Sequence, residues 1–160
     1  MISVSKTIPV NPPGTDIRLE RADVWRGLEA KANNALPFVP SMTHCEVISQ
    51  SGNVIEREIE FRGDRFGERV TLTEPEHVVF ERTWGPVLGV IRNEIVQDAG
   101  GELRLRFAFD LELEGVAADS EQEREYEQTM SGDYLKAVDA TLAAIRRWVR
   151  EGTPTAAAEA

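Results

Sequence analysis

Residues 101–115 read GELRLRFAFDLELEG and alternate apolar and charged side chains in the clearest pattern of the sequence. The apolar positions are Leu103, Leu105, Phe107, Phe109, Leu111 and Leu113. Successive side chains of a β-strand point to opposite faces, so this period of two predicts a strand with one dry and one wet face. Such a strand is typical of an antiparallel sheet that is covered on one side only.

The element that covers the dry face is predicted to be a long helix over about residues 120–150. Apolar residues recur in this segment at steps of three or four, as they do along one face of an α-helix. Ser120, followed three residues later by Glu123, resembles a capping box at the helix start. Arginines fill the last turns, where the helix dipole favours positive charge. At 1.5 Å per residue, this helix would be about 45 Å long.

Five further strand-like runs precede residue 101, and short turns rich in glycine, proline and asparagine separate them. These runs are HCEVISQS (44–51), NVIEREIEF (53–61), FGERVTLTE (66–74), HVVFERTW (77–84) and VLGVIRNEIVQ (87–97). Turns this short leave no room for crossover helices, so neighbouring strands should be antiparallel.

The N-terminal part of the chain supplies one more strand and a helical region. Residues 2–10 alternate as a strand, and a proline near the end of this run marks it as an edge strand. Residues 20–33 carry apolar side chains at helical spacing. Phe38 and Val39 lie between two prolines and read as a short apolar plug. The sequence therefore predicts an α+β fold: a seven-stranded antiparallel sheet around a long C-terminal helix, with two short helices after the first strand.

Composition excludes several classes of partner. The chain has 160 residues and a formal net charge of −10, which argues against a nucleic-acid groove or an anionic membrane surface. The single Cys45 excludes an internal disulfide framework and favours the reducing cytoplasm. No apolar run approaches the roughly 20 residues of a membrane span, and no signal-peptide core follows Met1. We therefore expect an acidic cytoplasmic protein without a membrane span.

The order of elements resembles the helix-grip fold of the START-like, or SRPBCC, superfamily. Within that superfamily, several short stretches of the sequence resemble the AtaL-like group of uncharacterised proteins. The residues that carry the closer resemblance are Val24, Trp25, Leu28, Phe38, Val39, Pro40, Arg57, Asn93, Tyr134, Ile145 and Arg146. The resemblance implies one START-like domain over residues 1–151. Gly152, Thr153 and Pro154 stop the predicted helix, so a flexible tail is expected over residues 152–160. The resemblance also implies a deep, mostly apolar cavity between sheet and helix, which relatives in the wider superfamily use for lipids, hormones or polyketide-like molecules. It implies no settled activity for the AtaL-like group.

Motifs for metal or nucleotide chemistry are missing from the sequence. There is no GxGxxG and no GxxxxGK[ST], so nucleotide binding through these motifs is unsupported. His44 and Cys45 are adjacent in a predicted strand and point to opposite faces, so they cannot readily share a metal ion. His44 and Glu46 would form an acid–base pair only if they faced the cavity, and the outward orientation is favoured. No metal site and no cofactor are predicted.

Arg57 is the main candidate for contact with a ligand. In residues 53–61 the apolar side chains share one face, and the alternation places Arg57 on that same inward face. A buried arginine is costly unless it is paired. In the functional interpretation, the guanidinium of Arg57 binds a carboxylate or enolate oxygen of a ligand through its fork of donors. In the structural interpretation, Arg57 forms an internal ion pair, or its side chain extends to the cavity rim.

Other side chains are predicted to line the cavity beside Arg57. Asn93 shares an uncharged face with Ile91, and it could orient a ligand carbonyl or satisfy a buried water. Tyr134 lies on the apolar stripe of the C-terminal helix and could direct its hydroxyl inward. Arg82 is also placed on the inner face, but near a strand end where solvent is expected. The apolar part of the predicted ligand site is Ile91, Phe107 and Phe109.

Three functions remain compatible with the sequence, and whether the chain is an enzyme stays open. The first is binding of an apolar, lipid- or polyketide-like small molecule that bears a carboxylate or carbonyl group. The second is an enzyme of the cyclase or dehydratase type, in which one polar side chain moves a proton. The third is an interaction module with a vestigial pocket, acting through its surface or as a homodimer.

Overall fold

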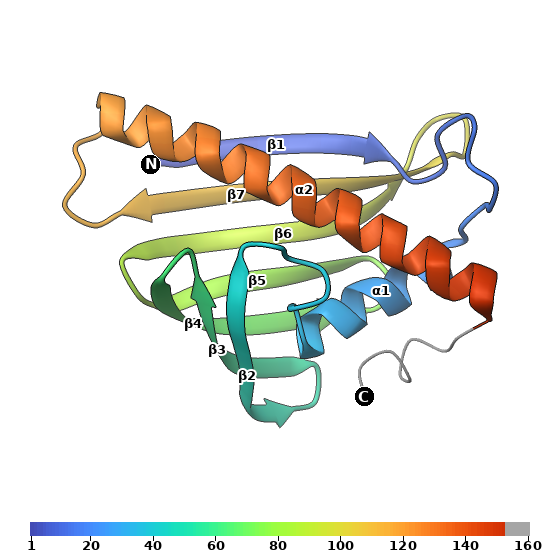
Figure 1. Ribbon diagram of the computed structural model, residues 1–160, viewed down its shortest axis with the longest axis horizontal. Helices are drawn as coiled ribbons and strands as arrows, with labels where there is room; N and C mark the ends of the chain where they lie inside the picture. The colour runs from blue at the N-terminus through green and yellow to red at the C-terminus, as the bar shows by residue number, and fades with distance from the viewer. Residues whose placement is uncertain (153–160) are drawn as a thin grey trace.

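The computed structural model describes residues 1–152 and contains seven strands and two helices in that range (Figure 1). The strands are β1 (Ile2–Pro9), β2 (Met42–Ser51), β3 (Val54–Phe61), β4 (Asp64–Thr73), β5 (His77–Trp84), β6 (Val87–Gln97) and β7 (Leu103–Leu113). The helices are α1 (Arg21–Asn33) and α2 (Glu121–Glu151). The predicted α+β helix-grip fold is confirmed.

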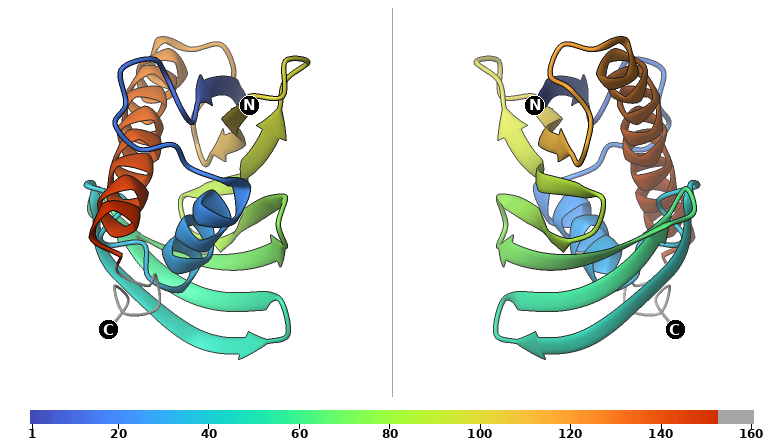
Figure 2. Two further views of the ribbon diagram at one scale, coloured as in Figure 1. Left: turned by 90° about the vertical axis from the view of Figure 1, so that its right-hand side faces the viewer. Right: turned by 90° about the vertical axis from the view of Figure 1, so that its left-hand side faces the viewer.

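All seven strands form one antiparallel sheet in the order β1-β7-β6-β5-β4-β3-β2. The sequence-adjacent strands from β2 to β7 pair as a meander, and β1 closes the other side of β7 as an edge strand. The strands curve strongly, so that the sheet wraps around the helices on its concave side (Figure 2). Side chains of the sheet reach both helices: Arg57 of β3 donates to the Lys31 carbonyl of α1, and Arg82 of β5 contacts Tyr134 of α2.

Both helices lie on the same face of the sheet. Helix α2 crosses this face diagonally, and α1 lies beside its C-terminal half (Figures 1 and 2). The two helices approach closely at Gly27, where any larger side chain would overlap that of Ile145. Since the alternating apolar residues of β7 are buried against this layer, the predicted dry face is confirmed.

The start and end of α2 follow the capping signals in the sequence. The Ser120 side chain accepts a hydrogen bond from the backbone N–H of Glu123 at 3.2 Å. The Glu123 carboxylate accepts a hydrogen bond from the backbone N–H of Asp119, so the reciprocal half of the capping box is shifted by one residue. Gly152 ends the helix with φ at 69°, in the left-handed region that glycine tolerates. The rest of the predicted tail, 153–160, lies outside the described residues.

The prediction of two short helices after the first strand holds only for α1. Within residues 1–152, the segment that follows α1 contains hydrogen-bonded turns, with Phe38 and Val39 both donating to the carbonyl of Ala35. The neighbouring prolines prevent this segment from extending into a helix. Phe38 is nevertheless a buried plug, because its ring packs edge-on against Trp148 of α2 at 5.4 Å.

Candidate functional site

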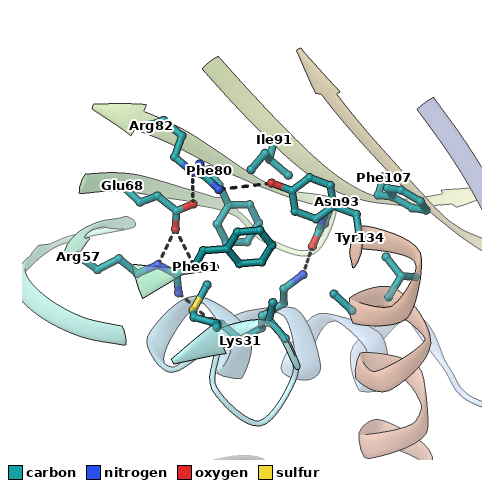
Figure 3. A pocket seen from close by; sticks show the side chains of 14 residues that line it. Lys31, Arg57, Phe61, Glu68, Phe80, Arg82, Ile91, Asn93, Phe107 and Tyr134 are labelled. Atoms are coloured by element: carbon teal, nitrogen blue, oxygen red, sulfur yellow. Dashed lines mark hydrogen bonds and ion pairs between the residues drawn. The ribbon is translucent and has the colours of Figure 1, made fainter. Parts of the chain in front are cut away.

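A cavity of about 40 Å³ lies between the concave face of the sheet and the two helices (Figure 3). Its lining residues are Lys31, Val39, Met42, Arg57, Phe61, Glu68, Phe80, Arg82, Ile91, Asn93, Phe107, Tyr134, Ala137 and Val138. Most of these side chains are apolar, but four of them carry a formal charge. Because a single buried water needs at least about 10–15 Å³, the cavity in this form has room for only a few water-sized groups.

Arg57 of β3 lies at the cavity wall with only 4% of its surface exposed, which confirms its inward orientation. Its Nε and Nη2 contact Oε1 of Glu68 at 2.9 and 2.7 Å. Its Nη1 donates to the carbonyls of Lys31 and Ala32, in the last turn of α1, at 3.0 and 2.9 Å. The internal ion pair is therefore the arrangement present, and it also ties the C-terminal end of α1 to the sheet.

Glu68 of β4 is the ion-pair partner whose negative charge compensates the buried positive charge of Arg57. It is 3% exposed and also accepts a hydrogen bond from Nε of Arg82 through Oε2, at 3.3 Å. Burial by itself would raise the pKa of this carboxyl, but the charges of Arg57 and Arg82 and their hydrogen bonds hold the pKa below its usual value. Glu68 is therefore ionised at neutral pH and shared between two arginines.

Arg82 of β5 is less fully paired than Arg57. Its Nη2 lies 3.4 Å from the hydroxyl of Tyr134, and its guanidinium lies over the Phe66 ring at 4.0 Å. Its Nη1 is buried and has no hydrogen-bond partner among the described residues. The expectation that Arg82 sits near solvent is wrong, because the residue is only 6% exposed and its side chain lies among those of Glu68, Phe66 and Tyr134.

Lys31 extends from α1 into the same cavity and is 8% exposed. Its Nζ donates to Oδ1 of Asn93 at 2.8 Å and lies 5.5 Å from the centre of the Phe80 ring. No carboxylate within residues 1–152 forms an ion pair with it. Burial, reinforced by the positive charge of Arg57 and only partly opposed by Glu68, lowers the pKa of Lys31 to about 8.

The charges at this site do not balance. Lys31, Arg57 and Arg82 face a single carboxylate, that of Glu68, among the residues that line the cavity. With Lys31 protonated, the cavity wall carries an excess of two positive charges, inside a chain whose formal net charge is −10. The unused donors of Arg82 and Lys31 favour an anionic or strongly accepting group in the cavity.

The residues predicted to contact a ligand largely come together. Those that line the cavity are Arg57, Ile91, Asn93, Phe107 and Tyr134. Phe109 is buried but does not line it; its ring packs against that of Tyr134 with 4.9 Å between centres. His44 does not line the cavity, and its neighbour Cys45 is the one that packs against the core. Burial raises the pKa of Tyr134, so its hydroxyl stays protonated and can donate.

A sequence model of one family, described as AtaL, acetylaranotin biosynthesis cluster protein L, matches residues 4–152. The match covers both helices, all but the first residues of the sheet, and every charged residue of the cavity. The chain belongs to the AtaL family. This confirms the resemblance to the AtaL-like group. No curated protein sequence shows significant similarity to the chain.

Solved structures share the fold of this AtaL-family chain at low sequence identity. The aromatase/cyclase Zhui from Streptomyces sp. R1128 aligns with a TM-score of 0.68 and 14% identity, covering 92% of this chain and 94% of that one. A START superfamily protein from Mycobacterium smegmatis aligns with a TM-score of 0.65 and 13% identity, covering 92% and 99%. The di-domain aromatase/cyclase StfQ of the steffimycin biosynthetic pathway aligns with a TM-score of 0.70 and 10% identity, covering 94% and 52%. These likenesses establish a START-like fold.

Two charged residues of the AtaL-family cavity, Lys31 and Glu68, are not among those predicted from sequence. For both residues, the spacing from neighbouring apolar residues indicates an inward-facing side chain. Lys31 follows Leu28 by three residues on the apolar side of α1, and Glu68 alternates with Phe66 and Val70 on the inner face of β4. The inward position of each was readable from periodicity, but their pairing depends on contacts between distant elements.

The described residues were also compared with the requirements of a metal site and of a membrane-spanning helix. Within residues 1–152, His, Cys, Asp and Glu side chains do not form any group of three or more that could hold a metal ion. Over the same range, neither helix combines the length and the apolar character needed to cross a membrane.

Proposed function

We propose that the protein binds a small organic molecule with an apolar body and an acidic oxygen in the cavity between the sheet and α2. The apolar body packs against Ile91, Phe107 and the ring of Tyr134, while Arg82 and Lys31 donate hydrogen bonds to the oxygen. The observation that carries this proposal is the buried excess of positive charge, with Nη1 of Arg82 left without a partner among the described residues. Arg57 acts as a positioning residue that holds Glu68 and the end of α1 in place.

The charge preference of the cavity can be tested with phenylacetate and its neutral amide, phenylacetamide, which has nearly the same shape. We expect the acid to bind at least about tenfold more tightly, since hydrogen bonds to charged groups contribute roughly 1.5–3 kcal/mol each. Arg82→Met should reduce this preference about tenfold, whereas binding of the amide should change little. Titration calorimetry measures both affinities.

The control for Arg82→Met is Arg106→Met, which removes an arginine whose ion pair with Glu94 is exposed on the outer face. This control should leave the preference for the acid unchanged. Circular dichroism establishes that each variant is folded before binding is measured. Equal weakening of both probes by Arg82→Met, or equal affinity of the parent protein for both, would contradict the proposal.

The size of the cavity sets a second expectation. At about 40 Å³ it is smaller than the roughly 150 Å³ of an engineered apolar cavity that holds benzene, so a ring or a longer lipid- or polyketide-like body requires it to widen. Met42 lines the cavity and is only partly buried, and an unbranched thioether side chain is easily displaced. Met42 is therefore the side chain whose movement would admit such a ligand.

Met42→Ala is expected to raise the affinity for phenylacetate and phenylacetamide alike, by about three- to tenfold, because the ligand no longer has to displace the methionine. The cost in stability should stay near 1–2 kcal/mol, since the residue is only partly buried. Ile48→Ala removes an exposed side chain from the same strand and should leave both affinities unchanged. Unaltered binding by Met42→Ala would show that ligands do not enter past this residue.

The alternative of a cyclase- or dehydratase-type enzyme is supported by one specific observation. Lys31 is a cavity amine whose pKa of about 8 lies within reach of neutral pH, so it can hold or release a proton there. Two of the three solved structures described above are aromatase/cyclases. The interaction-module alternative would be favoured by a solid apolar core, whereas four charged side chains line this cavity.

A further inference from the structure

Lys31 has the surroundings of a reactive amine. Its Nζ lies in the cavity, close to the face of Phe80, and is held by the neutral oxygen of Asn93. An ammonium group kept for structure is usually paired with a carboxylate, and none within residues 1–152 pairs with this one. The carboxylate of the cavity, Glu68, is instead shared by the two arginines.

The neutral form of the amine is accessible at this site. Removal of a lysine from water and the nearby charge of Arg57 both disfavour the ammonium form, and together they lower the pKa to about 8. Roughly a tenth of Lys31 is therefore unprotonated at neutral pH, compared with well under a thousandth of an ordinary lysine. A desolvated lysine beside another cation is a recognised arrangement for nucleophilic attack on carbonyl carbon.

We propose that Lys31 forms a covalent imine with an aldehyde or ketone group of a ligand that occupies the cavity. The inference rests on the proposed function for the acidic half of that ligand, which Arg82 of β5 would hold while Lys31 approaches the carbonyl from α1 (Figure 3). The chemical class that satisfies both groups is an oxo acid or a 1,3-dicarbonyl compound in its enolate form.

The bond changes balance without any further reagent. The lone pair of neutral Nζ attacks the carbonyl carbon, and the π electrons of the carbonyl move to its oxygen. A proton passes from nitrogen to that oxygen to give a carbinolamine. The carbinolamine oxygen then takes a second proton from solvent, the C–O bond breaks to release one water, and the nitrogen lone pair forms the protonated C=N bond on Lys31. The resulting iminium withdraws electrons from the adjacent carbon, as a cyclisation or a loss of carbon dioxide would require.

The chain offers a clean way to trap this imine, because Lys31, Lys6 and Lys136 are its only lysines. Glyoxylate, which joins an aldehyde to a carboxylate, is incubated with the full chain and sodium cyanoborohydride near neutral pH. Peptide mass mapping then gives the rate of adduct formation at each lysine. We expect Lys31 to react at least tenfold faster than the exposed Lys6 and Lys136, which act as internal controls in the same molecule.

Acetaldehyde, a neutral aldehyde of similar size, separates this inference from the proposed function. Selective modification of Lys31 by glyoxylate but not by acetaldehyde supports both. Selective modification by both aldehydes at equal rates supports the imine and contradicts the preference for an acidic ligand. Reaction of Lys31 no faster than Lys6 and Lys136 overturns the imine, even where phenylacetate binds. Lys31→Arg, which keeps a cation at this position but removes the nucleophilic amine, should lose the adduct there while Lys6 and Lys136 still react at their parent rates.

Discussion

Glu68→Gln is expected to lower the free energy of unfolding by about 3–5 kcal/mol, the usual cost of removing one partner from a buried ion pair. The substitution keeps the size of the side chain but removes the charge that compensates Arg57 and Arg82, which are 4% and 6% exposed. With Lys31 close by, three buried cations would then share one cavity without any carboxylate. Urea denaturation followed by circular dichroism measures the loss directly.

The control for this substitution is Glu94→Gln, which disrupts the pair with Arg106 on the outer face, where about 40% of each side chain is exposed. Exposed pairs contribute about 0–1 kcal/mol, so this variant should unfold almost like the parent. A loss of less than about 1 kcal/mol for Glu68→Gln would show that the two buried arginines do not depend on this carboxylate.

Acid titration gives an independent check on Glu68. Its pKa in the folded protein lies below the ordinary value of 4.5. A carboxyl with a lowered pKa contributes stability that is present above the unfolded-state pKa and is lost as the pH falls through the folded-state pKa. The difference in stability between the parent and Glu68→Gln should therefore persist down to about pH 4.5 and shrink only below it.

Much of the fold was predictable because it depends on local patterns. The alternation in residues 101–115 and the Ser120 cap are features of neighbouring residues, and both reappear in β7 and α2. The same rule placed Arg57 inside, since the apolar residues of β3 share its face. Applied to β4, it would also have placed Glu68 inside.

The parts of the site that could not be predicted from the sequence depend on how the helices and strands pack against one another. Arg82 was expected near solvent because it lies close to the end of β5, but it is 6% exposed and its Nη2 contacts Tyr134 of α2. The partner of Arg57 and the neutral contact of Lys31 arise where β3, β4, β6 and α1 meet, and no spacing along the chain specifies them. Cavity volume is likewise a property of side-chain packing. A deep cavity was expected by resemblance, and a small one is present.

Lys31→Met is expected to stabilise the protein at neutral pH, and the gain should disappear as the pH rises. Lys31 has a pKa of about 8 in the folded protein and 10.5 as its ordinary value, so the unfolded chain binds more protons between these limits. Stability of the parent therefore rises with pH across this window, and below pH 8 the buried charge imposes its full cost. That cost is at most on the order of 3 kcal/mol, and methionine avoids it while filling similar space.

The measurement is the difference in unfolding free energy between the parent and Lys31→Met at several pH values from about 7 to about 10, the range that contains most of the titration window of Lys31. Other groups that titrate there are common to both proteins and cancel in the difference. Lys136→Met, which removes an exposed lysine from α2, should show no pH-dependent difference. A constant difference for Lys31→Met over this range would mean that the amine titrates as an ordinary lysine. The pH at which the difference begins to fall reports the folded-state pKa of Lys31, and hence how much neutral amine the cavity holds for reaction with a carbonyl group.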